Sequence, residues 1–564
     1  MNAVLDLLKT LNNKGIRLSI GEGDNLVLRG VKEQLTKDLL EGIKQQKAEL
    51  LAILKSNSTQ INDSYIEQVP RCQPLPLSFS QKRLWLIDQI SGQSKQYNIP
   101  IQISFSGELN YQALERAFVD ILQKHEILRT TYHMEIDSDP YQSISEVETF
   151  ELGIVDLSEV ENAAKYQQLT EFINQEVERS FSLSSDLMLR AKLIKENAQQ
   201  HVLLMTLHHI AADGWSMRIL QNDLVYFYQC HADDRYAAVK NNGTPLNIQY
   251  ADYAAWQAST ITKGGLAASL DYWANNLKHV EPLHGLVTNG IRNRKRNYQG
   301  KVLNQSFRIE QYKTLKEICN RYQVTMFMLL ESCFAFLISQ FSHRDQVVIG
   351  TPVAGRYIQS TEPLIGFFVN SLVLKSEFSP EQRFSECLAK NKEVILNAYE
   401  HQQVPFDLIV ETLNPRREES YDPIFQIVFG FNQAESFETQ LNNLHLSIED
   451  RFEVSIKAKT DLELVVSEKQ DGLDISWTYD CELFSADMVT VLSECYEKLL
   501  NVVCKQPECK LGDIKILPDA HLRSTLAFEK GPAHGEEPAF LLEQFISQAQ
   551  AHPEHLAVRE GELS

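Results

Sequence analysis

The sequence predicts an α/β protein in which a two-lobed structure of about 430 residues follows a small N-terminal unit. The length of 564 residues is too great for one ordinary domain. Between about residues 75 and 510, segments with helical periodicity alternate with short apolar segments typical of strands. Polar, linker-like segments at 57–73 and from 515 onward separate this span from the two ends of the chain.

Composition and charge exclude several classes of protein. The formal net charge is −21, which disfavours non-specific nucleic-acid binding. The chain has 43% hydrophobic residues but no apolar run long enough to span a bilayer, and its first ten residues lack the features of a secretory signal. Nine scattered cysteines without a CxxC pair indicate reduced thiols. We therefore expect a cytoplasmic protein that binds neither nucleic acid nor a membrane.

Residues 1–56 are predicted to form an α+β unit. Apolar residues at helical spacing begin at Val4, and a second helical pattern follows Thr36, a candidate N-cap. Between them, "IRLSI" and "LVLRG" are short strand patterns joined by "GEGDN", which favours a β-hairpin because glycine and asparagine tolerate positive φ.

The main span divides into two predicted lobes, residues 74–245 and 246–514. Its clearest elements are the helices "QALERAFVDILQKH", "WSMRILQNDLVYFYQC" and "TMFMLLESCFAFLISQF", and the strands "QHVLLMTLHH", "QVVIGTPV" and "NSLVLKSEF". The remaining residues, 515–564, contain a linker rich in proline and glycine and then the start of a helix and a strand. This last segment is interpreted as the truncated beginning of a further domain.

The segment "LHHIAADGWS", residues 207–216, is the candidate reaction centre. Side chains alternate along a strand, so only one of the two adjacent histidines can face a given cavity. Gly214 permits close backbone approach, and Ser216 is a candidate N-cap of the next helix. Three interpretations are open: a packed histidine pair, a metal site, or an acyl-transfer site in which His209 accepts a proton. A metal site is the weakest, because no second ligand cluster lies at suitable spacing.

Seven segments together make the acyl-transfer interpretation the strongest. Residues 207–216 resemble the HHxxxDG core of the condensation domains of nonribosomal peptide synthetases. Six further segments resemble that family's other motifs and follow in its order: "LSFSQKRLWLI" (77–87), "KHEILRTTY" (124–132), "YADYAAW" (250–256), "IGFFVNS" (365–371), "HQQVPFD" (401–407) and "REESYDPIFQ" (417–426).

The resemblance implies a fold like that of chloramphenicol acetyltransferase, with two lobes forming a V around an active-site tunnel. Two carrier proteins would insert phosphopantetheine arms from opposite mouths, and an acceptor aminoacyl amine would attack a donor acyl or peptidyl thioester. The chain itself would bind no cofactor or metal and would act on phosphopantetheine thioesters held by its partners. The "SQKRLWLI" and "LRTTY" forms resemble the subtype that joins two L-configured residues.

The resemblance also implies roles for individual residues. His209 matches the second histidine of the core and is the expected catalytic residue, with His208 in a supporting position. Asp213 matches the structural acid, with Arg129 as its expected ion-pair partner, and capping of the following helix is the alternative role for Asp213. Gly214 is expected to keep the passage clear and to place its N–H near the developing oxyanion. A further pair, Gly366 and Asn370, belongs to the segment expected to cross between the lobes and line the tunnel.

The N-terminal unit resembles the hairpin-containing TubC-type docking domains of synthetase subunits. The resemblance implies that the C-terminal docking motif of an upstream subunit adds as a strand beside the hairpin, with Arg17, Arg29 and Lys32 available to acidic residues of that motif. The expected partners are therefore that subunit with its donor carrier protein, and the acceptor carrier protein and adenylation domain of the chain's own module. The tail from about residue 537 resembles the start of such an adenylation domain. The chain itself is expected to be monomeric.

Two other functions remain open from the sequence. The first is an acyltransferase that uses coenzyme A or a fatty-acyl starter, although the DFGWG motif of the plant-type coenzyme A relatives is absent. The second is a non-catalytic scaffold that only receives a carrier protein, which the intact His209, Asp213 and Gly214 disfavour. The identity of the substrates does not follow from any of these motifs.

Overall fold

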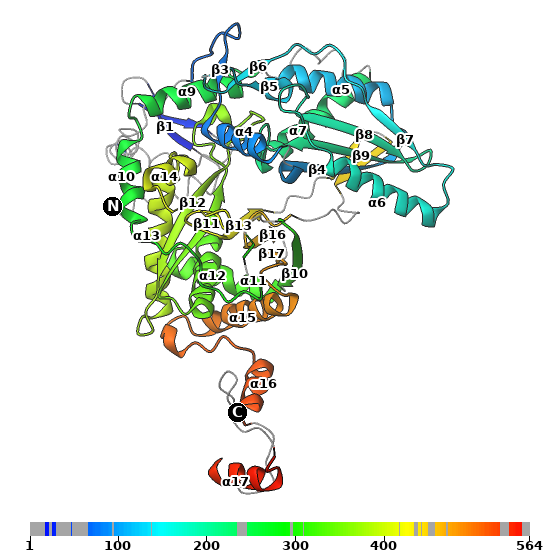
Figure 1. Cartoon of the computed structure of the whole chain (residues 1–564). Helices are drawn as coiled ribbons and strands as arrows, with labels where there is room; N and C mark the ends of the chain where they lie inside the picture. The colour runs from blue at the N-terminus through cyan, green and yellow to red at the C-terminus, as the bar shows by residue number, and fades with distance from the viewer. Residues whose placement is uncertain are drawn as a thin grey trace.

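The protein was analysed as a computed structural model. It describes residues 17–21, 25–29, 47, 66–530 and 541–554, apart from internal segments at 93–94, 137, 234–244, 291, 294–296, 308, 417, 434–437, 442, 449–456 and 470–471. Two lobes meet at an angle, and the C-terminal helices extend away from the second lobe (Figure 1). Each lobe has its own six-stranded sheet and its own hydrophobic core. The predicted two-lobed α/β architecture is therefore confirmed.

The sheet of the first lobe has the strand order β14-β15-β4-β9-β8-β7. Strand β9 is apolar on both faces because both are covered: Leu203, Met205 and Leu207 pack in the main core, and Val202 and Leu204 pack against helix α6. These strands are β4 (Asn98–Gly107), β7 (Gly153–Asp156), β8 (Leu189–Lys195), β9 (Gln200–His208), β14 (Glu438–Leu441) and β15 (Leu444–Ile448). A small sheet of β3 (Leu75–Pro76), β5 (Thr130–His133) and β6 (Tyr141–Ile144) completes the lobe.

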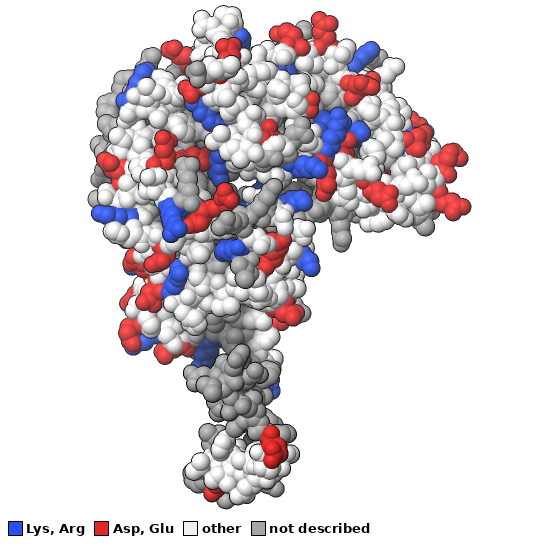
Figure 2. Space-filling view, in the orientation of Figure 1, with Lys and Arg blue, Asp and Glu red and all other residues white. Residues whose placement is uncertain are grey.

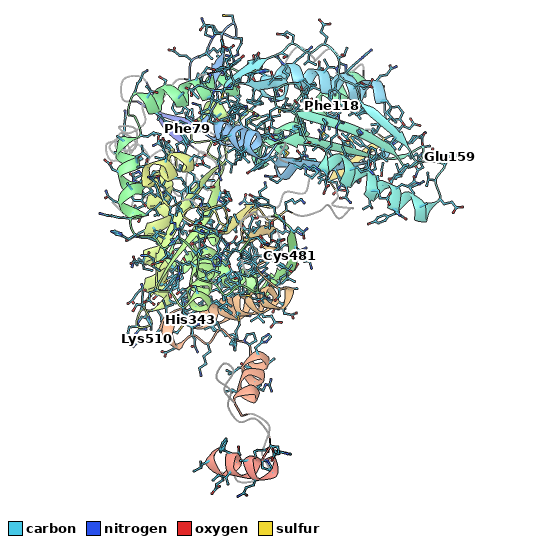
Figure 3. All side chains as sticks on the ribbon, viewed as in Figure 1. Phe79, Phe118, Glu159, His343, Cys481 and Lys510 are labelled. Carbon is cyan, nitrogen blue, oxygen red and sulfur yellow. The ribbon has the colours of Figure 1, made fainter. Side chains whose placement is uncertain are left out.

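Helices α5 and α7 pack against each other on one face of this sheet, with α6 on the other. The amphipathic pattern of α5 explains its position, since Leu114, Phe118 and Ile121 form its buried face (Figure 3). The helices of this lobe are α4 (Phe79–Ser91), α5 (Tyr111–Lys124), α6 (Asn162–Glu178), α7 (Gly214–Ala232) and α9 (Tyr250–Thr262), with 3-10 turns η2 (Lys95–Tyr97) and η3 (Glu126–Arg129).

The second lobe has a sheet of order β10-β17-β16-β13-β11-β12. Its strands are β10 (Gly300–Phe307), β11 (Gln346–Val353), β12 (Asn370–Glu377), β13 (Ile427–Gln433), β16 (Leu462–Lys469) and β17 (Gly472–Asp480). Its helices are α10 (Ala267–Asn276), α11 (Ile309–Tyr322), α12 (Met326–Ser342), α13 (Phe384–Glu400), α14 (Phe406–Leu413) and α15 (Ala486–Lys505), with 3-10 turns η5 (Gln359–Thr361) and η6 (Leu511–Asp513). Helix α12, buried along most of its length, lies at the centre of this core.

Two segments cross from one lobe to the other and change the predicted division of the chain. Strand β15 pairs with β4, so residues 444–448 extend the first sheet although they lie far beyond the predicted lobe boundary at residue 245. Helix α9 also packs with the first lobe, through Tyr250 and Tyr253. The segment 246–514 is therefore not wholly second-lobe structure, because these pieces bury their apolar faces against the first core.

The ends of the chain are described in part. Strands β1 (Arg17–Gly21) and β2 (Asn25–Arg29) pair antiparallel, as predicted for the N-terminal hairpin. The helices predicted on either side of the hairpin, and Lys32, lie outside the described residues. Within the predicted C-terminal linker, residues 519–530 form helix α16 (Asp519–Lys530) instead, followed by α17 (Leu541–Ala551).

A search of the described residues for membrane-spanning segments found no single helix of sufficient length and hydropathy. One pair, Glu310–Tyr322 with Met326–Ser342, passes the test together, but it is bent by 100° between its helices. Most of its second helix is buried in the core of the second lobe.

Candidate active site

The two histidines lie where the central strand of the first lobe ends. Strand β9 ends at His208, so His209 is the first residue beyond the strand. The sequence pattern predicted His209 as the last residue of that strand. The His209 N–H donates to the carbonyl of Tyr97 at 2.8 Å, which fixes the backbone at this point. Helix α7 then begins at Gly214, five residues after His209.

His208 is packed inside the first lobe. It is 1% exposed, its Nδ1 accepts a hydrogen bond from the Ile210 N–H at 3.1 Å, and its ring lies against Phe181 and Tyr97. Burial lowers the pKa of His208 to about 3, and the charge of Arg190 acts in the same direction. The imidazole is therefore neutral near pH 7 and is packed inside the lobe.

His209 faces the second lobe. Its ring meets the ring of Phe367 edge-on, with 4.8 Å between centroids, and Phe367 belongs to the segment between β11 and β12 of the second lobe. Burial lowers the pKa of His209 to about 3, and the charge of Lys459 contributes. The side chain is half-buried, and its Nδ1 is buried with no hydrogen-bond partner in the described part of the chain. A neutral imidazole thus stands at the junction of the lobes.

The ion pair of Asp213 differs from the predicted one. Asp213 Oδ1 lies 3.2 Å from Nη2 of Arg356, with both side chains almost fully buried, and Oδ2 accepts from the Phe368 N–H at 3.0 Å. Arg129 instead donates to the carbonyls of Leu122 and Ser145. The prediction of Arg129 was wrong because the carboxylate points toward the second lobe, whose loop after β11 supplies the arginine.

The N-cap of helix α7 is not the predicted Ser216 but Asp213, for which capping was the alternative role. Asp213 Oδ1 accepts from the Ser216 N–H at 2.9 Å. The Ser216 hydroxyl donates to the same carboxylate at 2.7 Å and accepts from the Gly366 N–H at 3.1 Å. Asp213 therefore caps the helix and ties it to the crossing segment at once.

Five of the quoted motifs, far apart in the sequence, contribute residues to one hydrogen-bonded network around this loop. Ser78 Oγ lies 2.8 Å from the Tyr250 hydroxyl, which donates to the carbonyl of Phe367 at 2.7 Å. The side-chain amide of Gln81 donates to the Tyr132 hydroxyl at 3.1 Å and lies 3.4 Å from the carbonyl of Ile210. These motif residues thus have structural roles around the loop that carries His209.

The two predicted tunnel residues lie on the crossing segment but act differently. Gly366 is packed against the first lobe, whereas Asn370 begins β12 in the second. The Asn370 amide donates to the carbonyls of Gln402 and Val404, and its oxygen accepts from the Phe406 N–H. Asn370 therefore fixes the turn before α14.

That turn carries a further contact between the lobes. Arg83 on α4 of the first lobe forms an ion pair of 3.4 Å with Asp407 on α14 of the second lobe. Arg83, which lies in the motif at 77–87, is thus placed where the two lobes meet.

The two glycines of the site predict opposite responses to substitution. A Cβ at Gly214 would meet no atom within 4 Å, whereas one at Gly366 would lie 2.1 Å from Tyr250 and 2.6 Å from Phe368. We expect Gly366→Ala to lower the free energy of unfolding by about 1–3 kcal/mol, because the core must shift. Gly214→Val should leave the melting temperature within a few degrees but lower kcat/KM, because the added side chain would occupy the open space at this position. Thermal melts and carrier-bound turnover of both variants measure this. A Gly214→Val variant with full activity would contradict a passage at this position.

One residue of the site was not predicted from the sequence. Arg356 follows "TPVAG" at the end of β11, and its separation of 143 residues from Asp213 gives no periodic signal. Only the packing of the second lobe against the first brings Arg356 to the loop that carries Asp213.

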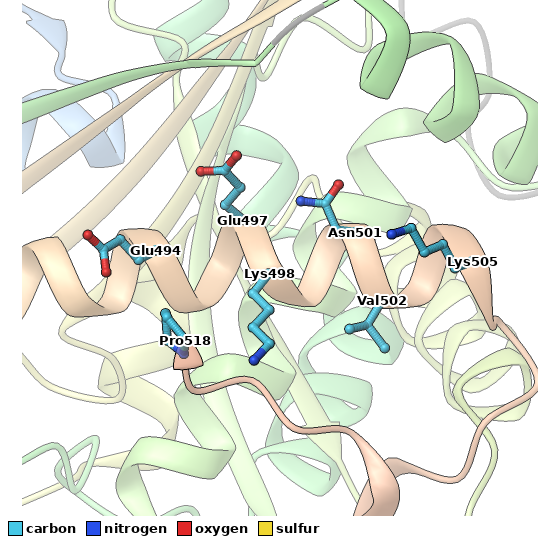
Figure 4. Close-up of a pocket in the computed structure, with 7 residues that line it drawn as sticks. All are labelled: Glu494, Glu497, Lys498, Asn501, Val502, Lys505 and Pro518. Atoms are coloured by element: carbon cyan, nitrogen blue, oxygen red, sulfur yellow. The ribbon is translucent and has the colours of Figure 1, made fainter. Parts of the chain in front are cut away.

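Other candidate sites were sought among the described residues. No group of three or more His, Cys, Asp and Glu side chains there is arranged to hold a metal ion. A surface hollow of about 410 Å³ lies along α15, lined by Glu494, Glu497, Lys498, Asn501, Val502, Lys505 and Pro518 (Figure 4). It belongs to the second lobe and contains none of the motif residues, so it is not the candidate active site.

Comparison with protein families identifies two regions. Residues 72–525 match the family model of the condensation domain, and residues 4–56 match that of the TubC N-terminal docking domain. The first match spans both lobes and all seven motifs. The second contains the β1–β2 hairpin and the predicted docking residues.

Curated relatives are peptide synthetases. The chain is 34% identical over 473 residues to one of the linear gramicidin synthase proteins of Brevibacillus parabrevis, a match that covers 83% of this chain and 9% of that protein. It is 31% identical to a dimodular nonribosomal peptide synthase of Bacillus subtilis (strain 168), covering 87% of this chain and 21% of the relative. The chain thus spans only a small part of the relatives it matches.

Solved structures share the fold. The X-domain from teicoplanin biosynthesis, in complex with OxyB, has a TM-score of 0.72 at 25% identity and covers 80% of this chain and 98% of its own. The first condensation domain of the calcium-dependent antibiotic synthetase, with a substrate analogue, has a TM-score of 0.64 at 15% identity, covering 80% of this chain and all of that one. At that identity the second likeness concerns the fold alone.

Proposed function

Because the chain belongs to the condensation-domain family, we propose that it forms an amide bond between two carrier-bound substrates. The donor is an acyl or peptidyl thioester and the acceptor an aminoacyl thioester, each on the phosphopantetheine arm of a carrier protein. The observation that carries the proposal is the neutral His209 at the junction of the lobes, held by the Asp213–Arg356 pair beside the open space at Gly214.

The reaction needs no oxidant, reductant or bound cofactor. The acceptor nitrogen attacks the thioester carbon, the C–N bond forms, and the C–S bond breaks. The nitrogen loses one proton and the departing thiolate gains one, so the product is an amide on the acceptor arm and a free thiol on the donor arm. The first turn of α7 offers its N-terminal dipole to the oxyanion that develops at the carbonyl.

The lowered pKa of His209 limits what its ring contributes. An imidazole with a pKa of about 3 is unprotonated at neutral pH and can accept a hydrogen bond, but it is a weak base. A free α-amino group has a pKa of about 7.7–8.0 and is partly unprotonated without help. Orientation of two tethered substrates can supply an effective molarity of about 10⁵ M or more. We infer that His209 orients the amine and receives its proton only once the C–N bond has begun to form.

This role predicts a partial loss on substitution. His209→Ala and His209→Asn should lower the single-turnover rate by about 10²-fold, the lower end of the range for general base catalysis, without reaching background. The rising limb of the pH–rate profile should persist in both variants, since it belongs to the acceptor amine. His133→Ala, which removes a histidine of the same lobe outside the loop, is the control. Full activity of His209→Ala, with both carriers loaded, would exclude a role in the reaction.

The decisive experiment measures the product on the acceptor. The full chain is mixed with a loaded donor carrier and a loaded acceptor carrier, and the intact acceptor is examined by mass spectrometry. A mass gain equal to the donor acyl group, removed by amide-cleaving but not thioester-cleaving treatment, supports condensation. Transfer only from an acyl-coenzyme A would make the protein a free-standing acyltransferase, and carrier binding without product would make it a scaffold.

The N-terminal unit supports a second part of the proposal, docking to an upstream subunit. Arg17 and Arg29 are directly paired across the β1–β2 hairpin, so two cationic residues adjoin its open end. The acidic C-terminal motif of an upstream subunit would add as a strand to the hairpin, with weak and salt-sensitive affinity. Titration with that peptide tests this: binding should disappear on removal of residues 1–56, and binding that persists without them would overturn the assignment.

A further inference from the structure

The segment just before the motif at 77–87 is anchored to the first lobe. Residues 66–71 lie near the end of the stretch predicted as a linker, yet Ile66 is 2% exposed and packs in the core of this lobe. The Gln68 side-chain amide donates to the carbonyl of Asn247 at 2.8 Å, and the Val69 N–H donates to Asp252 Oδ1 at 2.7 Å. Both hydrogen bonds hold the segment at the N-terminal end of helix α9.

Arg71, in the same segment, binds the carboxylate of Asp252 with two nitrogens. Nη1 lies 2.6 Å from Oδ1 and Nη2 lies 2.9 Å from Oδ2, the bidentate geometry that suits a guanidinium and a carboxylate. The Asp252 side chain is 0% exposed, and its Oδ2 also accepts from the Gln249 N–H at 2.7 Å, which caps α9. Arg71 Nε makes a second ion pair, of 2.9 Å, with Glu126.

Burial distinguishes the Arg71–Asp252 pair from charges on the molecular surface. On the face shown in Figure 2, lysine and arginine side chains are interspersed with aspartate and glutamate, and exposed pairs of this kind contribute little to stability. A carboxylate that is removed from water depends on its counter-charge. Because Asp252 is fully buried, we expect loss of Arg71 to displace the backbone that Asp252 caps.

Tyr250, in the first turn of α9, connects this end of the helix to the candidate active site. Its hydroxyl donates to the carbonyl of Phe367 at 2.7 Å. Its ring packs closely under the crossing segment, since a Cβ at Gly366 would lie 2.1 Å from Tyr250 and the ring of Phe368 lies 4.8 Å away between centroids. Helix α9 thus fixes the backbone of Phe367, whose ring meets that of His209 at 4.8 Å between centroids.

We propose that Arg71 is a positioning residue for the condensation step, which acts through α9 to fix the crossing segment against His209. This inference rests on the proposed function. Without Arg71, the first turn of α9 loses the counter-charge of its cap, and the Tyr250 hydroxyl loses the fixed position from which it binds Phe367. Catalysis is sensitive to such a change, because a shift of 1 Å far from the reacting atoms can cost about 10²-fold in rate.

The test is single-turnover condensation by the full chain with both carriers loaded. Arg71→Met should lower the saturated rate per folded molecule by about 10-fold, while the carrier concentration that gives half the maximal rate stays within about twofold of wild type. A residue that only stabilises the fold would lower the melting temperature and leave the rate per folded molecule unchanged. Melting curves of each variant give the folded fraction.

Two further variants separate the contacts of Arg71. Arg71→Lys keeps the charge but not the two-nitrogen contact, so it should recover part of the rate, with a loss of about 3-fold. Glu126→Gln removes the second partner of Arg71 and leaves Asp252 paired, so its rate should stay within about twofold of wild type. A loss in Glu126→Gln equal to that in Arg71→Met would overturn the assignment to Asp252.

A double-mutant cycle tests the route through Tyr250. Tyr250→Phe removes the hydroxyl that binds Phe367 and should by itself lower the rate by about 10-fold; added to Arg71→Met, it should lower the rate by less than about twofold further. Arg83→Met breaks the ion pair with Asp407 elsewhere at the junction of the lobes, and its effect should multiply with that of Arg71→Met. Multiplying effects of Arg71→Met and Tyr250→Phe would overturn the inference, because the two residues would then act independently.

The outcomes separate this inference from the function on which it rests. If the wild-type chain forms no amide with any loaded carrier pair, the proposed function fails. If the wild type is active and either Arg71→Met or Tyr250→Phe keeps its rate per folded molecule, only the positioning role fails. Should Arg71→Met not fold, Arg71→Lys replaces it in the cycle, and an unchanged rate in that variant would overturn the inference.

Discussion

Replacing Arg356 with methionine is expected to lower the free energy of unfolding by about 3–5 kcal/mol, because it leaves a buried carboxylate without its counter-charge. Arg356 and Asp213 are almost fully buried at 3.2 Å, and Arg356 also donates to the carbonyls of Thr361 and Leu364 at 2.6 and 2.7 Å. Its guanidinium lies 4.1 Å from the ring centroid of Phe368. One side chain therefore holds the crossing segment and the N-terminus of α7 together, and denaturant unfolding of the variant measures its contribution.

A double-mutant cycle identifies the pair. Arg356→Met and Asp213→Asn should be strongly non-additive, since each variant removes the partner of the other. Arg129→Met with Asp213→Asn should add within about 0.5 kcal/mol, because these two residues share no hydrogen-bond partner. Additivity in the first cycle would contradict the Arg356–Asp213 pair. Coupling in the second cycle would support the Arg129–Asp213 pair expected from the sequence. Loss of activity in Arg356→Met beyond the unfolded fraction would show that the His209 loop has also moved.

The elements around the site were predictable wherever a local pattern determines them. The strand predicted at 200–209 is β9 (Gln200–His208), and the helix predicted at 215–230 is α7 (Gly214–Ala232). Both are marked by residues close in sequence: an apolar run covered on two faces, and a helical repeat after a capping residue. The position of His209 at the junction of these elements follows from the same local signals.

The sequence could not predict contacts that depend on how distant segments pack together. Asp213 and Ser216 are both good N-caps, and Asp213 takes the role because its carboxylate also meets Arg356 from the other lobe. "LHLSI" reads as a strand at 444–448, but nothing in its pattern indicates that it pairs with β4 of the first lobe. Strand periodicity reports which faces are buried and not which sheet buries them.

A carboxyl group in the core of the second lobe predicts an unusual dependence of stability on pH. Glu331 on α12 is 0% exposed, and neither of its carboxyl oxygens has a hydrogen-bond partner among the residues that the structure describes. Burial raises the pKa of Glu331 to about 8, far above the value near 4.3 in an unfolded chain. Between these two values the folded protein holds a proton that the unfolded chain has lost. The contribution of Glu331 to stability is therefore greatest below about pH 4.3 and is lost as the pH rises toward 8.

Glu331→Gln should remove this dependence. Each pH unit between the two pKa values costs about 1.4 kcal/mol, so the wild type should lose on the order of 4 kcal/mol relative to the variant between pH 5 and pH 8. Glu317→Gln changes an exposed carboxylate on the neighbouring helix α11 and should follow the wild type. Urea unfolding of the three proteins at pH 5, 6.5 and 8 measures how the free energy of unfolding depends on pH. Parallel curves for wild type and Glu331→Gln would mean that the buried carboxyl finds a partner or water in solution, whereas converging curves at low pH would place a protonated acid at the centre of this lobe.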